Sequence, residues 1–213
     1  MIFMRTAGII SEYNPFHRGH AWQIGELRRR LGAETAVVCA MSGSFVQRGD
    51  FAVMRTHARA EAAVRGGADL VLELPLPWAI SSAEGFARGG VGVLAATGVV
   101  GTLAFGSECG DTARLQRAAE TLLRADFPDA LREKLAKGLS FAAARESAAR
   151  ALIGEDAAVL REPNDILGVE YCKALLQSGS TIAPLAILRK VVGHNGGAAK
   201  SFASASHIRE LLT

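Results

Sequence analysis

The feature that most constrains this fold is a regular alternation of short β-branched runs with longer helical segments. Apolar runs occur at 6–10, 35–41, 68–74 and 101–106, and helical patterns follow them at 19–31, 56–67, 79–98 and 111–125. A strand followed by a helix and then by another strand places the two strands parallel, joined by a right-handed crossover. The sequence therefore predicts an α/β fold built around a parallel sheet.

The alternation changes after residue 110. Residues 111–178 show a run of helical patterns, and a fifth apolar run follows only at 181–189. We interpret the stretch of about 111–178 as a helical insertion in the crossover from the fourth strand to the fifth. A chain of 213 residues can bury roughly 70% of its unfolded surface, so we expect one domain over 1–213 rather than two small ones.

Composition argues against several classes of protein. No apolar run reaches the ~20 residues of a membrane helix, and Arg5 interrupts the first apolar stretch, unlike a secretory signal. Cys39, Cys109 and Cys172 are widely spaced and form no C-x-x-C pair, which argues against a disulfide framework and a zinc cluster. We therefore expect a soluble, cytoplasmic protein with no membrane partner. The net charge of +3 permits an anionic partner but is small for a protein that binds nucleic acid by charge alone.

Four loops that follow predicted strands carry the polar residues of a candidate site. They are NPFHRGH (14–20), MSGSFVQRGD (41–50), GSECG (106–110) and RKVVGHNGG (189–197). In an open parallel sheet, ligands bind at the carboxyl ends of the strands, where the strand order reverses. We therefore expect any active site at this edge of the sheet.

The first of these loops contains the motif H-x-G-H at residues 17–20. A helix that begins near Arg18 presents unpaired amide groups to an anion, and Gly19 lets that anion approach the backbone. His17 and His20 can then stabilise charge that develops on a phosphate oxygen. A zinc site would need a third ligand, and the nearby sequence offers none. One surface histidine and one structural histidine remain the alternative reading.

A second polar cluster lies near the end of the chain, in FASASHIRELL. Ser204, Ser206 and Arg209 surround the start of a predicted helix, a pattern that resembles I-S-S-T-x-I-R of nucleotidyltransferases. Hydroxyl and amide groups there can hold a β,γ-pyrophosphate, and the guanidinium adds a bidentate charge. A serine-capped helix with an exposed arginine is the alternative.

Six stretches carry a closer resemblance: EYNPFHRGH (12–20), MSGSFVQRGD (41–50), ADLVLELP (68–75), FGSE (105–108), PNDILGVEY (163–171) and ASASHIR (203–209). Taken in this order, they resemble the bacterial tRNA(Met) cytidine acetate ligases, which belong to the nucleotidyltransferase superfamily with an H-x-G-H motif. The resemblance implies a Rossmann-like five-stranded parallel sheet of order 3-2-1-4-5 with helices on both faces. It also implies an enzyme that uses ATP to form acetyl-adenylate, releases pyrophosphate, and transfers acetyl to N4 of the wobble cytidine of elongator tRNA(Met).

The resemblance implies roles for individual residues. His17 and His20 would be catalytic, stabilising the pentacoordinate α-phosphorus. The ATP-binding residues would be Ile10, Asn14, His17, Gly19, His20, Gly106, Asn164, Arg189, Lys190, Ser204, Ser206 and Arg209. Asn164 could equally cap the helix after Pro163. Magnesium would be carried by the ATP phosphates, so we expect no metal ligand from the protein.

The loop after the second strand is expected to cover acetate or the incoming cytidine. Its candidate residues are Ser42, Gln47 and Arg48, and an ordinary exposed loop is the alternative. Basic residues could also contact RNA: they are Arg28, Arg29 and Arg30 in one cluster and Arg48, Arg55, Arg59 and Arg65 on a neighbouring face. A solvated helix face explains the first cluster as well.

Family members of this kind continue past the I-R motif into a region that helps grip tRNA, whereas this sequence ends at Thr213. We therefore expect either a truncated piece or a short form, in which adenylate chemistry has better support than tRNA modification. Two other functions stay open: a small-molecule adenylyltransferase, and a non-catalytic nucleotide-binding or RNA-binding relative. The sequence does not indicate an oligomeric state.

Overall fold

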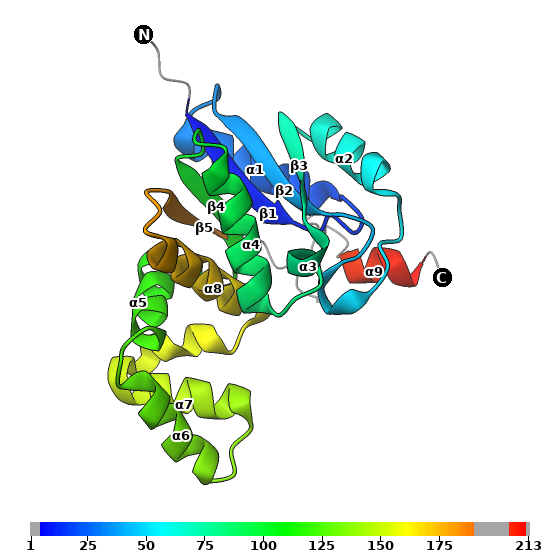
Figure 1. Ribbon diagram of the computed structural model, residues 1–213. Coiled ribbons are helices and arrows are strands. Elements are labelled where there is room, and N and C mark those ends of the chain that lie inside the picture. Colours follow the sequence, from blue (N-terminus) through cyan, green and yellow to red (C-terminus); the bar gives the residue numbers. More distant parts are fainter. Residues whose placement is uncertain (1–4, 190–204, 212–213) are drawn as a thin grey trace, which may run out of the picture.

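A computed structural model of the protein describes residues 5–189 and 205–211 and contains one five-stranded parallel sheet (Figure 1). The strands are β1 (Thr6–Ser11), β2 (Ala36–Ser42), β3 (Leu70–Leu74), β4 (Thr102–Ser107) and β5 (Ala183–Leu188). Their order is β3-β2-β1-β4-β5, and every neighbouring pair is parallel. The fold class and strand order expected from the sequence are confirmed, and each strand begins and ends close to its predicted bounds.

The helices are α1 (Arg18–Leu31), α2 (Thr56–Arg65), α3 (Leu76–Ala79), α4 (Ala83–Ala96), α5 (Thr112–Leu122), α6 (Phe127–Ala136), α7 (Phe141–Ile153), α8 (Pro163–Ser178) and α9 (Ala205–Glu210), with 3-10 turns η1 (Gln47–Gly49) and η2 (Gly154–Leu160). The helix predicted over 79–98 begins later, as α4, and the short α3 precedes it. Ser82 caps α4, since its hydroxyl accepts a hydrogen bond from the Gly85 amide. Among the described helices, none is both long and apolar enough to cross a membrane.

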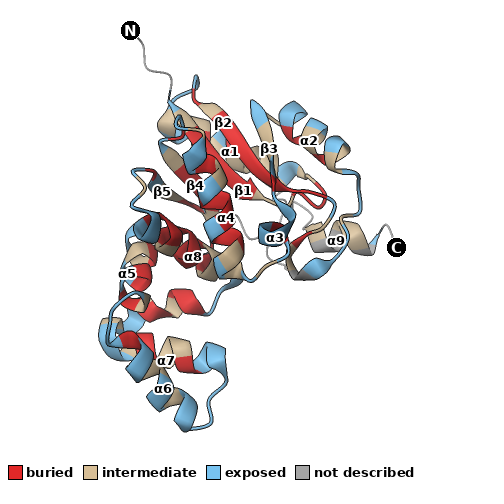
Figure 2. Ribbon diagram, in the orientation of Figure 1, coloured by how far each residue is buried: buried red, intermediate tan, exposed pale blue. Residues whose placement is uncertain are grey.

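Helices cover both faces of the sheet. Helices α1 and α2 pack on one face, while α4 and α8 pack on the other, so the central strands β2, β1 and β4 are buried between two apolar clusters (Figures 1 and 2). Successive side chains of a strand point to opposite faces. Accordingly, Ile9 belongs to the cluster beneath α1, and Ile10 belongs to the cluster beneath α4.

Two glycines allow α4 to lie very close to the central strand β1. A Cβ atom on Gly8 would lie 2.5 Å from Leu94 Cδ1, and one on Gly90 would lie 2.6 Å from Ile10 Cδ1. Any larger residue at either position would push the helix away from the strand. Because Ile10 also lines the cavity described below, this close packing helps set the position of the cavity wall.

The inserted helices leave the sheet and return to it through α8. Helices α5, α6 and α7 and turn η2 follow β4, extend away from α2 in Figure 1, and precede α8. The Asp111 carboxylate begins the insertion by accepting hydrogen bonds from the amides of Ala113 and Arg114. The predicted helical insertion is confirmed, and its last helix packs on β4, β5 and α4.

Candidate active site at the carboxyl edge of the sheet

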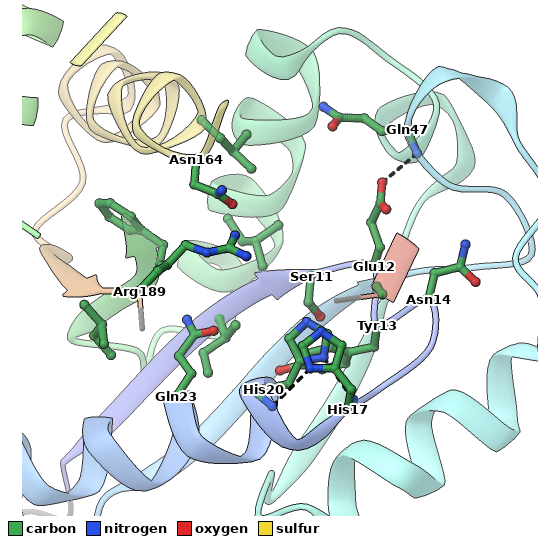
Figure 3. Close-up of a pocket in the computed structure, with 18 of the residues that line it drawn as sticks. Ser11, Glu12, Tyr13, Asn14, His17, His20, Gln23, Gln47, Asn164 and Arg189 are labelled. Atoms are coloured by element: carbon green, nitrogen blue, oxygen red, sulfur yellow. Dashed lines mark hydrogen bonds between the residues drawn. The ribbon is translucent and has the colours of Figure 1, made fainter. Parts of the chain in front are cut away.

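A cavity of about 580 Å³ lies at the carboxyl ends of β1, β4 and β5, next to the start of α1 (Figure 3). This volume is in the range of small-molecule sites. The residues expected to bind ATP that line the cavity are Ile10, Asn14, His17, Gly19, His20, Gly106, Asn164, Arg189 and Arg209. Lys190, Ser204 and the side chain of Ser206 lie outside the described part of the chain.

The two histidines of the H-x-G-H motif cap α1 with their own side chains. His17 Nδ1 accepts a hydrogen bond of 3.0 Å from the Gly19 amide, and His20 Nδ1 accepts one of 3.2 Å from the His17 amide. The rings stack with centroids 3.7 Å apart. The His20 amide in turn donates to the His17 carbonyl. The amides of Gly19 and His20 are therefore bonded within the protein, in contrast to the free amides expected from the sequence.

The histidines instead offer their outer ring nitrogens to the cavity. Because both Nδ1 atoms accept hydrogen bonds, the proton of each neutral ring lies on Nε2. Neither Nε2 atom has a protein partner in residues 5–189 and 205–211. Burial lowers the pKa of His20 to about 3, helped by His17 and Arg189, and burial followed by Arg189 lowers the pKa of His17. At neutral pH, both rings are uncharged hydrogen-bond donors.

Two arginines bring positive charge to the same cavity from the other end of the chain. Arg189 follows β5, and Figure 3 shows its guanidinium pointing into the cavity. A Cβ atom on Gly106 would lie 3.2 Å from Arg189 Cγ, so the glycine leaves room for this side chain. Arg209 on α9 donates a 2.8 Å hydrogen bond to the Asn14 carbonyl. The structure thus brings Arg209 and the H-x-G-H residues to one cavity.

The loop after β2 is attached to the cavity by two side chains. Asn14 Oδ1 accepts a hydrogen bond of 2.8 Å from the Val53 amide, and Glu12 Oε1 accepts one of 2.8 Å from the Gln47 amide. Gln47 lines the cavity, whereas Ser42 ends β2 completely buried and outside the cavity lining. For Arg48, the structure describes the backbone in η1 but not the side chain.

Arg59 was expected on an exposed basic face, and this prediction is wrong. The side chain is completely buried, and its guanidinium donates to the carbonyls of Met54, Glu12, Ser42 and Gly43. These carbonyls belong to the ends of β1 and β2 and to the loops beyond them. Arg59 therefore holds these loops together and does not face solvent.

The basic cluster Arg28–Arg30 of α1 is also paired within the protein. Arg28 forms a 2.8 Å ion pair with Asp69, and Glu26 pairs with Arg29 at 2.7 Å and Arg30 at 2.8 Å. These pairs support the structural reading of this cluster. In the second cluster, Arg59 is buried and Arg65 pairs with Glu61 at 2.6 Å.

Sequence reasoning missed the contacts that fix Asn164. It is not the cap of α8, because that helix is preceded by Glu162, which makes no side-chain capping bond. The Asn164 amide group donates instead to Glu108 Oε1, and the Asp165 amide donates to Glu108 Oε2 at 2.9 Å. The sequence shows both motifs, FGSE and PND, which contain these residues. It does not show that the two motifs are in contact.

Comparison with known proteins gives a consistent result. The model of the HIGH Nucleotidyl Transferase family matches residues 4–213. The chain is 46% identical to a tRNA(Met) cytidine acetate ligase of Syntrophotalea carbinolica, over 98% of this chain and 51% of the relative. It is 42% identical to the ligase of the same name from Acetivibrio thermocellus, over 99% of this chain and 52% of the relative. The chain thus spans about half the length of the curated relatives it matches.

Solved structures give the same picture. The crystal structure of Thermotoga maritima TmcAL bound with alpha-thio ATP aligns with a TM-score of 0.86 and 42% identity, covering 98% of this chain and 50% of that one. An apo form of TmcAL from the same organism aligns with a TM-score of 0.88, covering 98% of this chain and 51% of that one. The likeness extends over nearly all of the present chain.

Proposed function

Because the chain belongs to the HIGH nucleotidyl transferase family, we propose that it binds ATP in the cavity at the carboxyl edge of the sheet and activates acetate as acetyl-adenylate. We extend the proposal to the next step, transfer of the acetyl group to N4 of the wobble cytidine of elongator tRNA(Met). The names of the relatives support the identity of both substrates, and the ATP analogue in the related TmcAL structure supports the nucleotide.

One observation carries the proposal for the first step. His17 and His20 line the same cavity that receives the Arg189 guanidinium, and their Nε2–H groups have no partner in the described part of the chain. Neutral N–H donors and a cation suit a triphosphate, and donors that are already held in place need no rearrangement when negative charge grows. The hydrogen bonds from the Gly19 and His17 amides to the two rings supply this rigidity.

The chemistry of the first step needs charge stabilisation rather than a base. An acetate oxygen attacks the α-phosphorus of ATP, a new P–O bond forms, and the bond from that phosphorus to the oxygen bridging to the β-phosphate breaks. Pyrophosphate leaves with the electron pair of that bond. Acetate is already ionised at neutral pH, so no proton has to be removed, and the protein's contribution is alignment and stabilisation of the phosphoryl oxygens.

Magnesium fits this site only as a companion of the nucleotide. Among the described residues, no three His, Cys, Asp or Glu side chains cluster as a metal site. Mg²⁺ usually binds through substrate phosphates with few protein carboxylates. When bound, the ion would supply further charge neutralisation, while His17, His20 and Arg189 would bind the phosphate oxygens.

The second step would use the same cavity from its open side. The cytidine amine attacks the acetyl carbonyl carbon, AMP leaves, and the amine releases one proton to solvent. Gln47, on the loop after β2, lines the cavity and would lie beside the acetyl group or the base. The loop 43–53 is held to the loop after β1 through Glu12 and Asn14, so its position relative to the histidines is defined.

Isotope exchange tests the first step directly. Protein, ATP, acetate and labelled pyrophosphate are incubated together, and label is expected to enter ATP only when acetate is present. Exchange that does not depend on acetate, or no exchange with any carboxylate, would contradict acetate activation. Acetyl transfer is measured separately with elongator tRNA(Met) and a transcript in which the wobble cytidine is replaced by uridine.

A further inference from the structure

A closed set of hydrogen bonds joins the loop after β4 to the start of α8. The Asp165 carboxylate is buried and accepts hydrogen bonds from the Ser107 hydroxyl and from the amides of Glu108, at 2.9 Å, and Cys109, at 3.1 Å. In return, Glu108 accepts from the Asp165 amide and the Asn164 side chain. Each segment therefore supplies a carboxylate to the other, and this arrangement fixes the Glu108 carboxylate in place.

The chemistry of Glu108 determines the orientation of the Asn164 amide. An ionised carboxylate has only acceptors, so the group of Asn164 that faces it must be the NH₂ donor. The carbonyl oxygen of the same planar amide must then point to the other side. Asn164 lines the cavity, its side chain enters the cavity from α8 in Figure 3, and Oδ1 has no partner in the described part of the chain.

We propose that Glu108 is a positioning residue that keeps the Asn164 carbonyl oxygen turned toward the cavity, where it accepts a hydrogen bond from the nucleoside part of ATP. This inference rests on the proposed function, because it takes ATP as the occupant. Two groups of the nucleoside offer suitable donors: the ribose hydroxyls and the 6-amino group of adenine. The histidines and Arg189 offer donors to the phosphates, so an acceptor on the α8 side gives the cavity two ends of opposite polarity.

The substitution Glu108→Gln tests this orientation with almost no change of shape. The single side-chain oxygen of glutamine would be needed by the Asp165 amide, so its NH₂ group would face Asn164. Asn164 would then turn its oxygen to residue 108 and its NH₂ to the cavity. The Asn164 NH₂ group would then face the donor group of the nucleoside, and two donors repel. We therefore expect the Kd for ATP to rise about 10- to 100-fold, with the thermal unfolding midpoint little changed.

A second substitution should restore binding. In the double variant E108Q/N164D, one carboxylate oxygen of residue 164 accepts from glutamine and the other faces the cavity as an acceptor. Residues 108 and 164 together also keep a single negative charge, whereas N164D alone would place two carboxylates in contact. ATP binding should recover in the double variant relative to both single variants, a non-additivity that a purely structural role would not produce. Glu162→Gln, on an exposed residue beside the same helix start, is the matched control.

Analogues identify the donor. Binding of 2′-deoxy-ATP, 3′-deoxy-ATP and inosine triphosphate is measured in wild type and E108Q. The analogue that lacks the group donating to Asn164 Oδ1 should bind wild type weakly, and its affinity should fall little further in E108Q. If E108Q binds ATP like wild type, if the double variant is no better than E108Q, or if ATP and all analogues weaken equally, the proposal is wrong. Failure of wild type itself to bind ATP would instead overturn the proposed function.

Discussion

Two parts of the same sheet edge use their polar groups in opposite ways. Beside β2, the guanidinium of Arg59 is buried and donates to four backbone carbonyls. Beside β1 and β5, His17, His20 and Arg189 face the cavity with N–H groups that have no described protein partner. The first group stabilises loops, and the second is available to a ligand. Substitutions should therefore lower stability on the β2 side and lower binding or catalysis on the cavity side.

The largest effect is expected on the cavity side, at His20. Replacing His20 by Ala removes one of the two Nε2–H donors, and loss of a preorganised donor costs about 10²- to 10³-fold in rate. Acetate-dependent ATP–pyrophosphate exchange measures this loss. His57→Ala, on an exposed residue of α2, is the control and should exchange at the wild-type rate. Normal exchange by H20A would show that the imidazole is not catalytic.

On the β2 side, Arg59→Met should reduce stability. The substitution leaves buried carbonyls without donors and removes a positive charge that lies near Glu12 and Glu73. Breaking such a buried charged network costs about 3 kcal/mol or more. Urea unfolding measures the free energy, with Arg65→Met on the exposed end of the same helix as control. A stability loss at Arg65 equal to that at Arg59 would remove the distinction between the two regions.

Arg189→Met should show the reverse pattern. Its guanidinium reaches into the cavity, so loss of a charge-assisted hydrogen bond to phosphate should raise the Kd for ATP about 10- to 100-fold, while urea unfolding stays near wild type. Isothermal titration with ATP measures the affinity. Arg132→Met on α6, whose ion pair with Asp129 is exposed, should leave ATP affinity unchanged. Equal affinity in R189M and wild type would exclude Arg189 from the phosphate site.

The smallest effect is a pH dependence of stability that originates in the histidine pair. Burial lowers the pKa of His20 to about 3, so below pH 6.5 the unfolded chain takes up a proton that the folded protein does not. The free energy of unfolding should therefore fall as the pH drops from about 6.5 toward 3, by roughly 1–2 kcal/mol between pH 7 and pH 5. His17, whose pKa is also lowered, adds to the same trend.

His20→Asn tests the origin of this slope. The variant has no titrating ring at position 20, so urea unfolding at pH 7 and pH 5 should give a flatter dependence than wild type. An unchanged slope would place the responsible group elsewhere. Ligand-free protein is used, since a bound anion would favour protonated histidine and reduce the effect.

The histidine side of the cavity could be predicted from the sequence, since its contacts are local. His17, Gly19 and His20 lie within one turn of the chain, so a strand, a loop and a helix start suffice to place them together. The use of the Gly19 amide by His17 was not predicted, because a histidine cap is rare compared with Ser, Thr, Asp or Asn. The sequence therefore suggested that the Gly19 amide binds a ligand, whereas in the structure it donates to the His17 side chain.

The α8 side could not be predicted, because its contacts join distant residues. Glu108 and Asn164 are 56 positions apart, separated by α5, α6, α7 and η2. A single sequence shows both motifs but not their distance in space. Arg59 was misplaced for a related reason: α2 carries Arg59 and Arg65, and only the contacts of Arg59 at the ends of β1 and β2 show which of the two is buried.

The central position of β1 has a consequence for the growing chain on the ribosome. This strand is synthesised before the other four described strands and can pair with β2 soon afterwards, but its other neighbour, β4, is complete only after residue 107. Until then, one edge of the strand that leads into the histidine loop stays open, and an unpaired edge is a template for aggregation. Translation speed between β2 and β4, and chaperones that shield nascent strands, should therefore influence the yield of active protein.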